Sequence, residues 1–141
     1  MYFRERIAEK LKSLERALLY LESRSDVSLH ELIENYELRS AVERNFQIAI
    51  EAAVDIGEMI ISQEGSSMPE TYREVFLRLG DLGVVPGDFA DRLSLMAGFR
   101  NILVHHYSEI DVVKLHDFLK NRLGDFRTFI RCIRTYLEER S

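Results

Sequence analysis

The sequence predicts an all-α fold, and three observations lead to that prediction. Only two prolines and seven glycines interrupt its 141 residues. Apolar residues recur at spacings of three and four along most of the chain, which is the period of an amphipathic helix. No alternation of apolar and polar residues extends beyond a few positions, as a β-strand would require. We expect one domain over residues 1–141, an up-and-down bundle of about five helices with short connections.

The first two helices are predicted from their apolar stripes. The first carries a stripe with spacings of four and three: Ile7, Leu11, Leu14, Leu18 and Leu21. A polar loop or short helical turn follows over residues 22–38. The second helix is expected over about 38–62, with this stripe: Val42, Phe46, Ile50, Ala53 and Ile60. Gly57 falls on the same stripe, where its missing side chain would let a neighbouring helix approach closely.

Turn-forming residues delimit the next two helices. Gly65 and the serines around it end the second helix, and Pro69 suits the first turn of a third helix over about 69–79. A cluster of glycines with a proline then separates it from a fourth helix over about 89–105. Asp88 has the side chain of an N-cap for that fourth helix.

The last helix is predicted to run to about Leu137. Ser108 and Asp111 resemble a capping pair for its start. Its apolar stripe is the longest in the chain: Val112, Leu115, Leu119, Leu123, Phe126, Ile130, Ile133 and Leu137. This unbroken stripe favours a single helix from the capping pair to Leu137.

Composition and charge narrow the possible function classes. The formal net charge of −5 argues against indiscriminate wrapping of nucleic acid, although it leaves room for a local basic groove. No apolar run approaches the roughly 20 residues that span a bilayer, and the charged N-terminus MYFRERIAEK is unlike a signal peptide. A single cysteine, Cys132, fits a reducing compartment. We expect a cytoplasmic protein with no membrane partner.

The stretch GFRNILVHHYSEID, residues 98–111, places a charge on an apolar helix face. At about 100° per residue, Arg100 lies on the line of these apolar residues: Phe89, Leu93, Met96, Leu103 and Tyr107. A guanidinium facing inward is costly unless it is paired or lies in a wet cleft. Leu95, Phe99 and Ile102 form a second apolar strip. A helix that is apolar on two sides is either central in its own bundle or shared with a second subunit. We favour the second, a homodimer, because so small a bundle has few neighbours to spare for one helix.

His105 lies roughly 140° from Arg100 on a continuous helix, whereas Asn101 lies one turn before it on the same side. Two arrangements bring the arginine and the histidine into one site. The helix ends near Val104 and His105 turns back, or the site is completed across a dimer axis. The two arrangements are compatible.

The same stretch combines side chains suited to proton transfer and phosphate binding. A histidine exchanges a proton near neutrality, and an arginine stabilises charge that develops on a phosphate. Arg100 and His105 together would suffice for RNA cleavage without a metal ion. In that reaction the 2′-hydroxyl attacks its own phosphate, with histidine as acid or base and arginine as electrostatic clamp. Asn101 would orient the imidazole or the phosphate.

Structural interpretations of these residues stay open at this point. A histidine at a helix end is often only a C-terminal cap, and Tyr107 on an apolar stripe is usually a core aromatic. A metal centre is not expected, because none of the four histidines stands in a Glu-x-x-His or His-x-x-x-His pair and Cys132 is isolated. No glycine-rich phosphate loop is present, and no cofactor is expected.

The last predicted helix carries a row of arginines at spacings of four and three: Arg127, Arg131 and Arg134. One interpretation is a solvated face with ordinary charge balance. The other is a wall of positive potential that guides RNA into a cleft despite the negative net charge.

One short motif and its flanks resemble a known family. Arg100, His105 and Tyr107 match the R-x-x-x-x-H-x-Y motif of HEPN-domain ribonucleases, and the form RNILVHHY resembles the HepT subfamily in particular. The likeness covers nearly the whole chain, because residues 39–60, 69–86 and 88–107 also resemble successive helices of that subfamily. HepT proteins are the toxin halves of toxin–antitoxin pairs with a minimal nucleotidyltransferase, MntA.

The resemblance implies a bundle that dimerises with its motif helices near the two-fold axis. It implies a metal-independent endoribonuclease with Arg100 and His105 as the catalytic pair, supported by Asn101. It also implies that the partner enzyme transfers AMP onto Tyr107 and so silences the toxin. An anionic group beside Arg100 would fill the phosphate pocket and neutralise its charge. Asp55, which faces away from the stripe of the second helix, is a candidate supporting residue.

We therefore consider three functions. The first is a homodimeric ribonuclease toxin of a type VII-like toxin–antitoxin system, acting on tRNA or mRNA and inactivated by AMP transfer to Tyr107. The second is a non-catalytic subunit that binds a nucleotide or a partner in a two-component minimal nucleotidyltransferase. The third is a structural helical dimer without a ligand, which leaves Arg100 unexplained.

Overall fold

The computed structural model describes residues 2–105 and 109–140, apart from the side chains of residues 104, 105 and 109–111. Over these residues it contains seven helices and no strand: α1 (Tyr2–Ser23), α2 (Leu29–Glu34), α3 (Tyr36–Gln63), α4 (Tyr72–Asp81), α5 (Gly87–His105), α6 (Glu109–Asn121) and α7 (Leu123–Glu139). The all-α prediction is confirmed for the described chain. The expected number of helices, about five, was too low.

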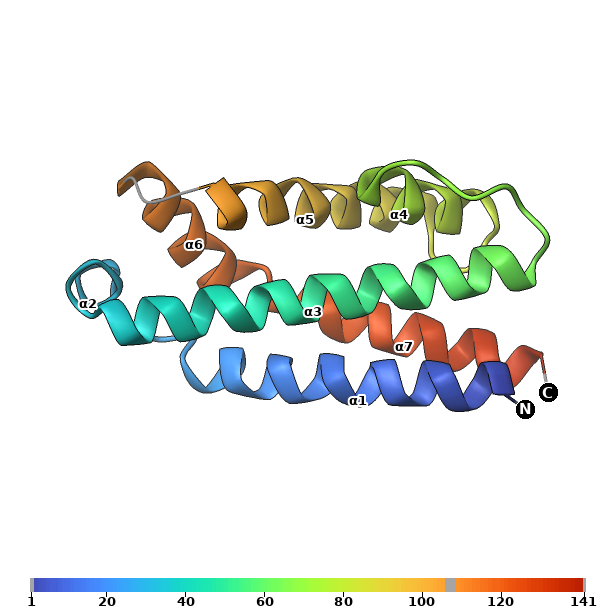
Figure 1. Ribbon diagram of the computed structural model, residues 1–141, viewed down its shortest axis with the longest axis horizontal. Helices are drawn as coiled ribbons and strands as arrows, with labels where there is room; N and C mark the ends of the chain where they lie inside the picture. The colour runs from blue at the N-terminus through green and yellow to red at the C-terminus, as the bar shows by residue number, and fades with distance from the viewer. Residues whose placement is uncertain (1, 106–108, 141) are drawn as a thin grey trace.

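The helices form layers on either side of α3, which runs through the middle of the molecule (Figure 1). On one side α1 packs along α3 and against α7, and on the other α4 and α5 lie side by side. Both chain termini lie at one end, and α2 packs against α6 at the other. Five phenylalanines are among the largest fully buried side chains: Phe46, Phe76, Phe99, Phe126 and Phe129. Their rings therefore join both layers to α3.

The additional helices have local causes. In α2, the Ser28 side chain accepts from the Glu31 amide and the Glu31 side chain accepts from the Ser28 amide, a complete capping box. The predicted last helix divides at Arg122, because α6 turns to pack against α2 while α7 lies along α1. The His116 side chain connects α6 to the segment before α2, because its Nε2 atom lies 3.1 Å from the carbonyl oxygen of Val27. The apolar stripe continues across the break, so periodicity alone could not reveal it.

Two predicted helix starts also need correction. The third helix begins at Tyr72 and not at Pro69, because the Thr71 side chain caps it by accepting from the Glu74 amide at 3.2 Å. The fourth begins one residue before Asp88, which therefore lies in the first turn and is not the N-cap. In the predicted capping pair of the last helix, residue 108 and the side chain of residue 111 lie outside the described part of the chain.

Two glycine predictions are confirmed. Gly65 follows α3 with φ +74°, and the Ser66 amide donates to the carbonyl of Ile61 at 3.1 Å, which closes the helix end. At Gly57, a Cβ atom would lie only 2.6 Å from Cγ1 of Val75. The missing side chain thus lets α4 approach α3. No helix within the described residues is both long and apolar enough to cross a membrane.

Candidate active site

Helix α5 is fixed to the core immediately beside Arg100. The Phe99 side chain is 2% exposed. Its ring stacks on Phe118 with centroids 4.0 Å apart and meets Phe46 edge-on at 5.2 Å. These ring contacts set the rotation of α5, and Arg100 consequently lies where α5 faces α3 and α4. The expected second apolar strip is only partly buried, because Leu95 is 53% exposed.

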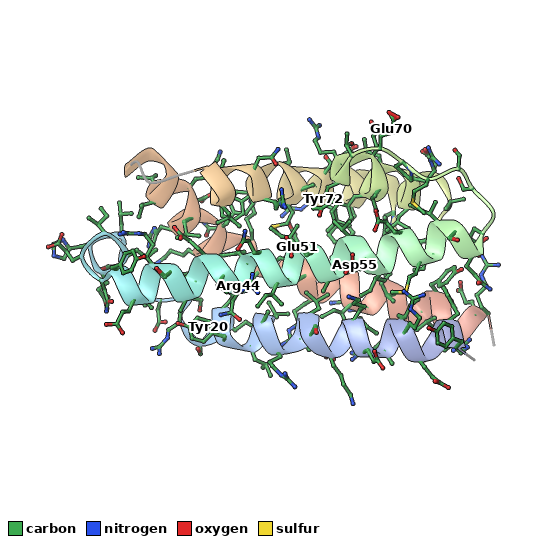
Figure 2. All side chains as sticks on the ribbon, in the orientation of Figure 1. Tyr20, Arg44, Glu51, Asp55, Glu70 and Tyr72 are labelled. Carbon is green, nitrogen blue, oxygen red and sulfur yellow. The ribbon has the colours of Figure 1, made fainter. Side chains whose placement is uncertain are left out.

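Arg100 is held by two neighbours from different helices. Its Nη2 atom lies 3.6 Å from Oε2 of Glu51 on α3, and its guanidinium carbon lies 5.2 Å from the centroid of the Tyr72 ring on α4. In Figure 2, Glu51 and Tyr72 lie near one another where α3 faces the α4–α5 layer. The ring contributes a cation–π contact, and the carboxylate supplies a nearby negative charge.

This pairing of Arg100 is incomplete. A distance of 3.6 Å is too long for a hydrogen bond, so Glu51 balances the charge without engaging a donor at short range. The Nε atom is buried and has no hydrogen-bond partner within the described part of the chain. The side chain as a whole is 31% exposed. A guanidinium in this state retains N–H donors for a further anion.

Arg100 opens into a groove between α4 and α5 with a volume of about 570 Å³. Asn101 lines the same groove, which brings two of the predicted catalytic residues together. The remaining lining residues are Thr71, Tyr72, Arg73, Glu74, Leu77 and Ala97. The groove thus combines two arginines with one carboxylate and an aromatic ring.

The other motif residues lie at the end of α5 or beyond it. His105 is the last residue of α5, so the helix ends close to the expected position, but the His105 side chain is outside the described part. Tyr107 also lies outside the described residues. The two arrangements predicted for His105, a histidine that turns back and a site completed across a dimer axis, both concern a side chain outside the described part of the chain.

Asp55 does not join this site. Its Oδ2 atom pairs with Nζ of Lys10 at 2.9 Å, in a different groove on the α1 side of α3. The two grooves share no lining residue. The carboxylate that reaches Arg100 is Glu51, one turn earlier on α3. Glu51 is the single charged residue in the stretch IAIEAAV, and this isolated charge was the sequence signal that could have identified it as a site residue. Tyr72, in contrast, had no comparable signal.

The arginine row on α7 is largely neutralised. Arg127 donates to both carboxylate oxygens of Glu22 at 3.0 and 2.7 Å, and Arg134 donates to Glu15 at 3.0 Å. The hydrogen bonds from Arg127 lower the pKa of Glu22. Arg131 is exposed beside Cys132. For two of the three arginines the structure therefore favours the charge-balanced interpretation over a wall of positive potential.

Possible metal ligands are dispersed over the described side chains. No group of three histidine, cysteine, aspartate or glutamate side chains comes together there. His116 is engaged with the backbone of Val27, and burial raises the pKa of the Cys132 thiol. The described side chains therefore offer no set of metal ligands.

Comparisons with known proteins agree with this arrangement. The family model described as ribonuclease HepT-like matches residues 7–133. The tRNA nuclease HepT of Aphanizomenon flos-aquae is 29% identical over 93% of this chain and 89% of its own. The mRNA nuclease HepT of Shewanella oneidensis is 31% identical over 72% of this chain and 76% of its own.

A solved structure shows the same fold. It is the tri-AMPylated HEPN toxin of Shewanella oneidensis in complex with MNT antitoxin, and it has a TM-score of 0.83. Its sequence identity is 28%, and the match covers 92% of this chain and 96% of that chain. The resemblance carried by RNILVHHY is thereby confirmed, and the chain belongs to the ribonuclease HepT-like family.

Proposed function

We propose that this chain is the endoribonuclease toxin of a toxin–antitoxin pair. The observation that carries the proposal is Arg100, a half-paired guanidinium that faces a groove on the helix that ends at His105. A purely structural arginine would be expected to have a carboxylate at hydrogen-bond distance, as Arg127 has in Glu22. The nuclease names of the relatives give further support.

In the proposed reaction the RNA supplies its own nucleophile. The 2′-oxygen forms a bond to the adjacent phosphorus and the bond from phosphorus to the 5′-oxygen breaks, which leaves a 2′,3′-cyclic phosphate and a 5′-hydroxyl. His105 takes the proton from the 2′-hydroxyl or gives one to the leaving oxygen. Arg100 stabilises the charge that builds up on the phosphate oxygens, and Asn101 orients the phosphate or the imidazole.

We also propose regulation by AMP transfer onto Tyr107 by a minimal nucleotidyltransferase partner. Tyr107 follows His105 by two residues, so an AMP group there would introduce an anion close to the site. That anion would compete with the RNA phosphate for Arg100. The AMPylated state of the Shewanella oneidensis toxin, in complex with its antitoxin, supports this proposal.

A homodimer with α5 near its axis remains part of the proposal. Leu95 on α5 and Val113 on α6 are 53% and 50% exposed, so apolar side chains are available for a second subunit. One domain over residues 1–141 and a cytoplasmic location likewise stay predictions.

The test is cleavage of a tRNA pool in EDTA by the wild-type protein and by His105→Ala, after intact-mass measurement has shown both to be free of AMP. We expect cleavage by the wild type and none by a folded His105→Ala protein. Equal cleavage by both would contradict the assignment of the histidine. No cleavage by the unmodified wild type would favour the non-catalytic subunit that binds a nucleotide or a partner.

A further inference from the structure

A second arginine lies in the groove of Arg100. Arg73, in the first turn of α4, is exposed and lines the groove together with Arg100 and Asn101. Within the described residues Arg73 has no ion pair or hydrogen bond from its side chain. It is therefore a cation with all of its donors available beside the proposed catalytic arginine.

The arginines in other parts of the molecule are mostly engaged. Arg92 pairs with Asp125 at 3.0 Å, and Arg140 pairs with Glu64 at 3.1 Å. Arg78 donates to the Ser66 hydroxyl at 2.8 Å. These contacts join helices and loops, and each has a structural purpose. Arg73 makes no comparable contact in the described chain, so its donors stay available to a ligand in the groove.

The shape and chemistry of the groove suit a single strand of RNA. The Tyr72 ring lines the groove and contacts Arg100, and Leu77 adds an apolar wall. Glu74 is the one carboxylate among the lining residues, against two guanidinium groups. Proteins that bind single strands combine cations for the backbone with aromatic and apolar surfaces for bases and sugars. A volume of about 570 Å³ lies within the range that accommodates a small ligand.

We propose that the groove between α4 and α5 is an RNA subsite next to the scissile bond, in which Arg73 binds a neighbouring phosphate. This inference rests on the proposed nuclease function, because Arg100 defines which phosphate is cleaved. It gives the RNA a path along α4. That path differs from the alternative considered along α7, where Glu22 and Glu15 already neutralise two arginines.

The test measures binding separately from cleavage. A mixed-sequence 2′-O-methyl oligoribonucleotide is the probe, since it lacks the 2′-hydroxyl nucleophile and is not cleaved. Its dissociation constant is measured at several salt concentrations with AMP-free wild-type protein, Arg73→Gln and Arg16→Gln. Arg16 is the matched control, because it is exposed on α1 and also has no ion pair within the described residues. Both variants remove one positive charge.

We expect Arg73→Gln to weaken binding about fivefold to tenfold and to reduce the slope of log K against log salt by about one. Arg16→Gln should stay within about twofold of the wild type with an unchanged slope. A loss of phosphate contact changes the slope, whereas a merely structural effect does not. Equal behaviour of the two variants, or no binding by the wild type, would overturn the inference.

Cleavage of unmodified RNA by the same preparations separates this inference from the proposed function. If the wild type cleaves and Arg73→Gln matches Arg16→Gln in binding, the subsite is wrong and the nuclease stands. If the wild type binds through Arg73 without cleaving, the groove binds RNA, but the proposed nuclease function and the placement of the groove next to a scissile bond are both wrong.

Discussion

The α1–α7 face and the α4–α5 face both carry arginines, but the two faces differ in how closely carboxylates pair with those arginines. On the first face, Arg127 and Arg134 are matched by carboxylates of α1 at hydrogen-bond distance. On the second, Arg100 meets Glu51 at 3.6 Å and Arg73 has no partner in the described chain. The first arrangement joins two helices. The second leaves positive charge and N–H donors facing a groove.

The difference shows that an arginine acquires its role from the helix across from it. The Glu22–Arg127 pair joins residues 105 positions apart, so only the packing of α1 on α7 decides that Arg127 is structural. Both partners are more than a third exposed, which limits what the pair adds to stability. We therefore regard the α1–α7 face as a structural contact between helices, called the seam below, and the α4–α5 face as the proposed RNA-binding surface.

The largest effect that we expect on stability concerns the contact that places α4 beside α3. Gly57→Ala would put a Cβ atom 2.6 Å from Cγ1 of the buried Val75, and α4 would have to shift. Overpacking of this kind costs about 1–3 kcal/mol, against a gain of about 1 kcal/mol in helix propensity. Urea unfolding should show net destabilisation. Gly124→Ala, where a Cβ atom meets nothing within 4 Å, is the control and should be neutral or stabilising.

The next effect concerns the ring that contacts Arg100. Tyr72→Leu removes a cation–π contact of about 0.5–2 kcal/mol and should lower kcat about 3-fold to 30-fold with a smaller change in KM. Tyr72→Phe keeps the ring and should retain most of the activity. The comparison of the two variants in steady-state cleavage decides the point. An equal loss in both would mean that the hydroxyl matters and that the ring face does not.

A smaller effect is expected at the seam. The Arg127 hydrogen bonds lower the folded-state pKa of Glu22 below its ordinary 4.5, so their stabilisation is present above that pH and is lost as pH falls through the lowered pKa. Arg127→Gln should therefore reduce the free energy of unfolding by about 0.2–1 kcal/mol at pH 7. The difference from the wild type should shrink at pH 3. A difference that grows on acidification would contradict the assignment.

The smallest effect should come from Arg131, the remaining exposed member of the α7 row. Arg131→Gln should change the dissociation constant of the 2′-O-methyl probe by less than about twofold, because a single distant surface charge is screened by salt. A loss as large as that of Arg73→Gln would show that RNA also follows α7, and it would break the contrast between the two faces.

The helical fold could be predicted from the sequence, whereas most of the contrast between the two faces could not. The apolar stripes predicted the main helices, because side-chain burial follows the helical period. The break between α6 and α7 at Arg122 could not be predicted, because the apolar stripe continues through it unchanged. Of the predicted site residues, Arg100 and Asn101 lie in one groove, and their catalytic roles stay predictions. Asp55 was chosen one turn away from Glu51, because a helical wheel gives directions on one helix and not the neighbour that fills them.

The most direct test of the account compares the two faces by charge-matched substitutions. Cleavage of RNA in EDTA is measured for Arg100→Gln and Arg127→Gln, each confirmed to be folded and free of AMP. We predict that Arg100→Gln lowers kcat/KM by about 10²-fold to 10³-fold, because it removes the group that stabilises charge on the phosphate. Arg127→Gln should stay within about twofold of the wild type. Similar losses in both variants, or full activity of Arg100→Gln, would contradict the account.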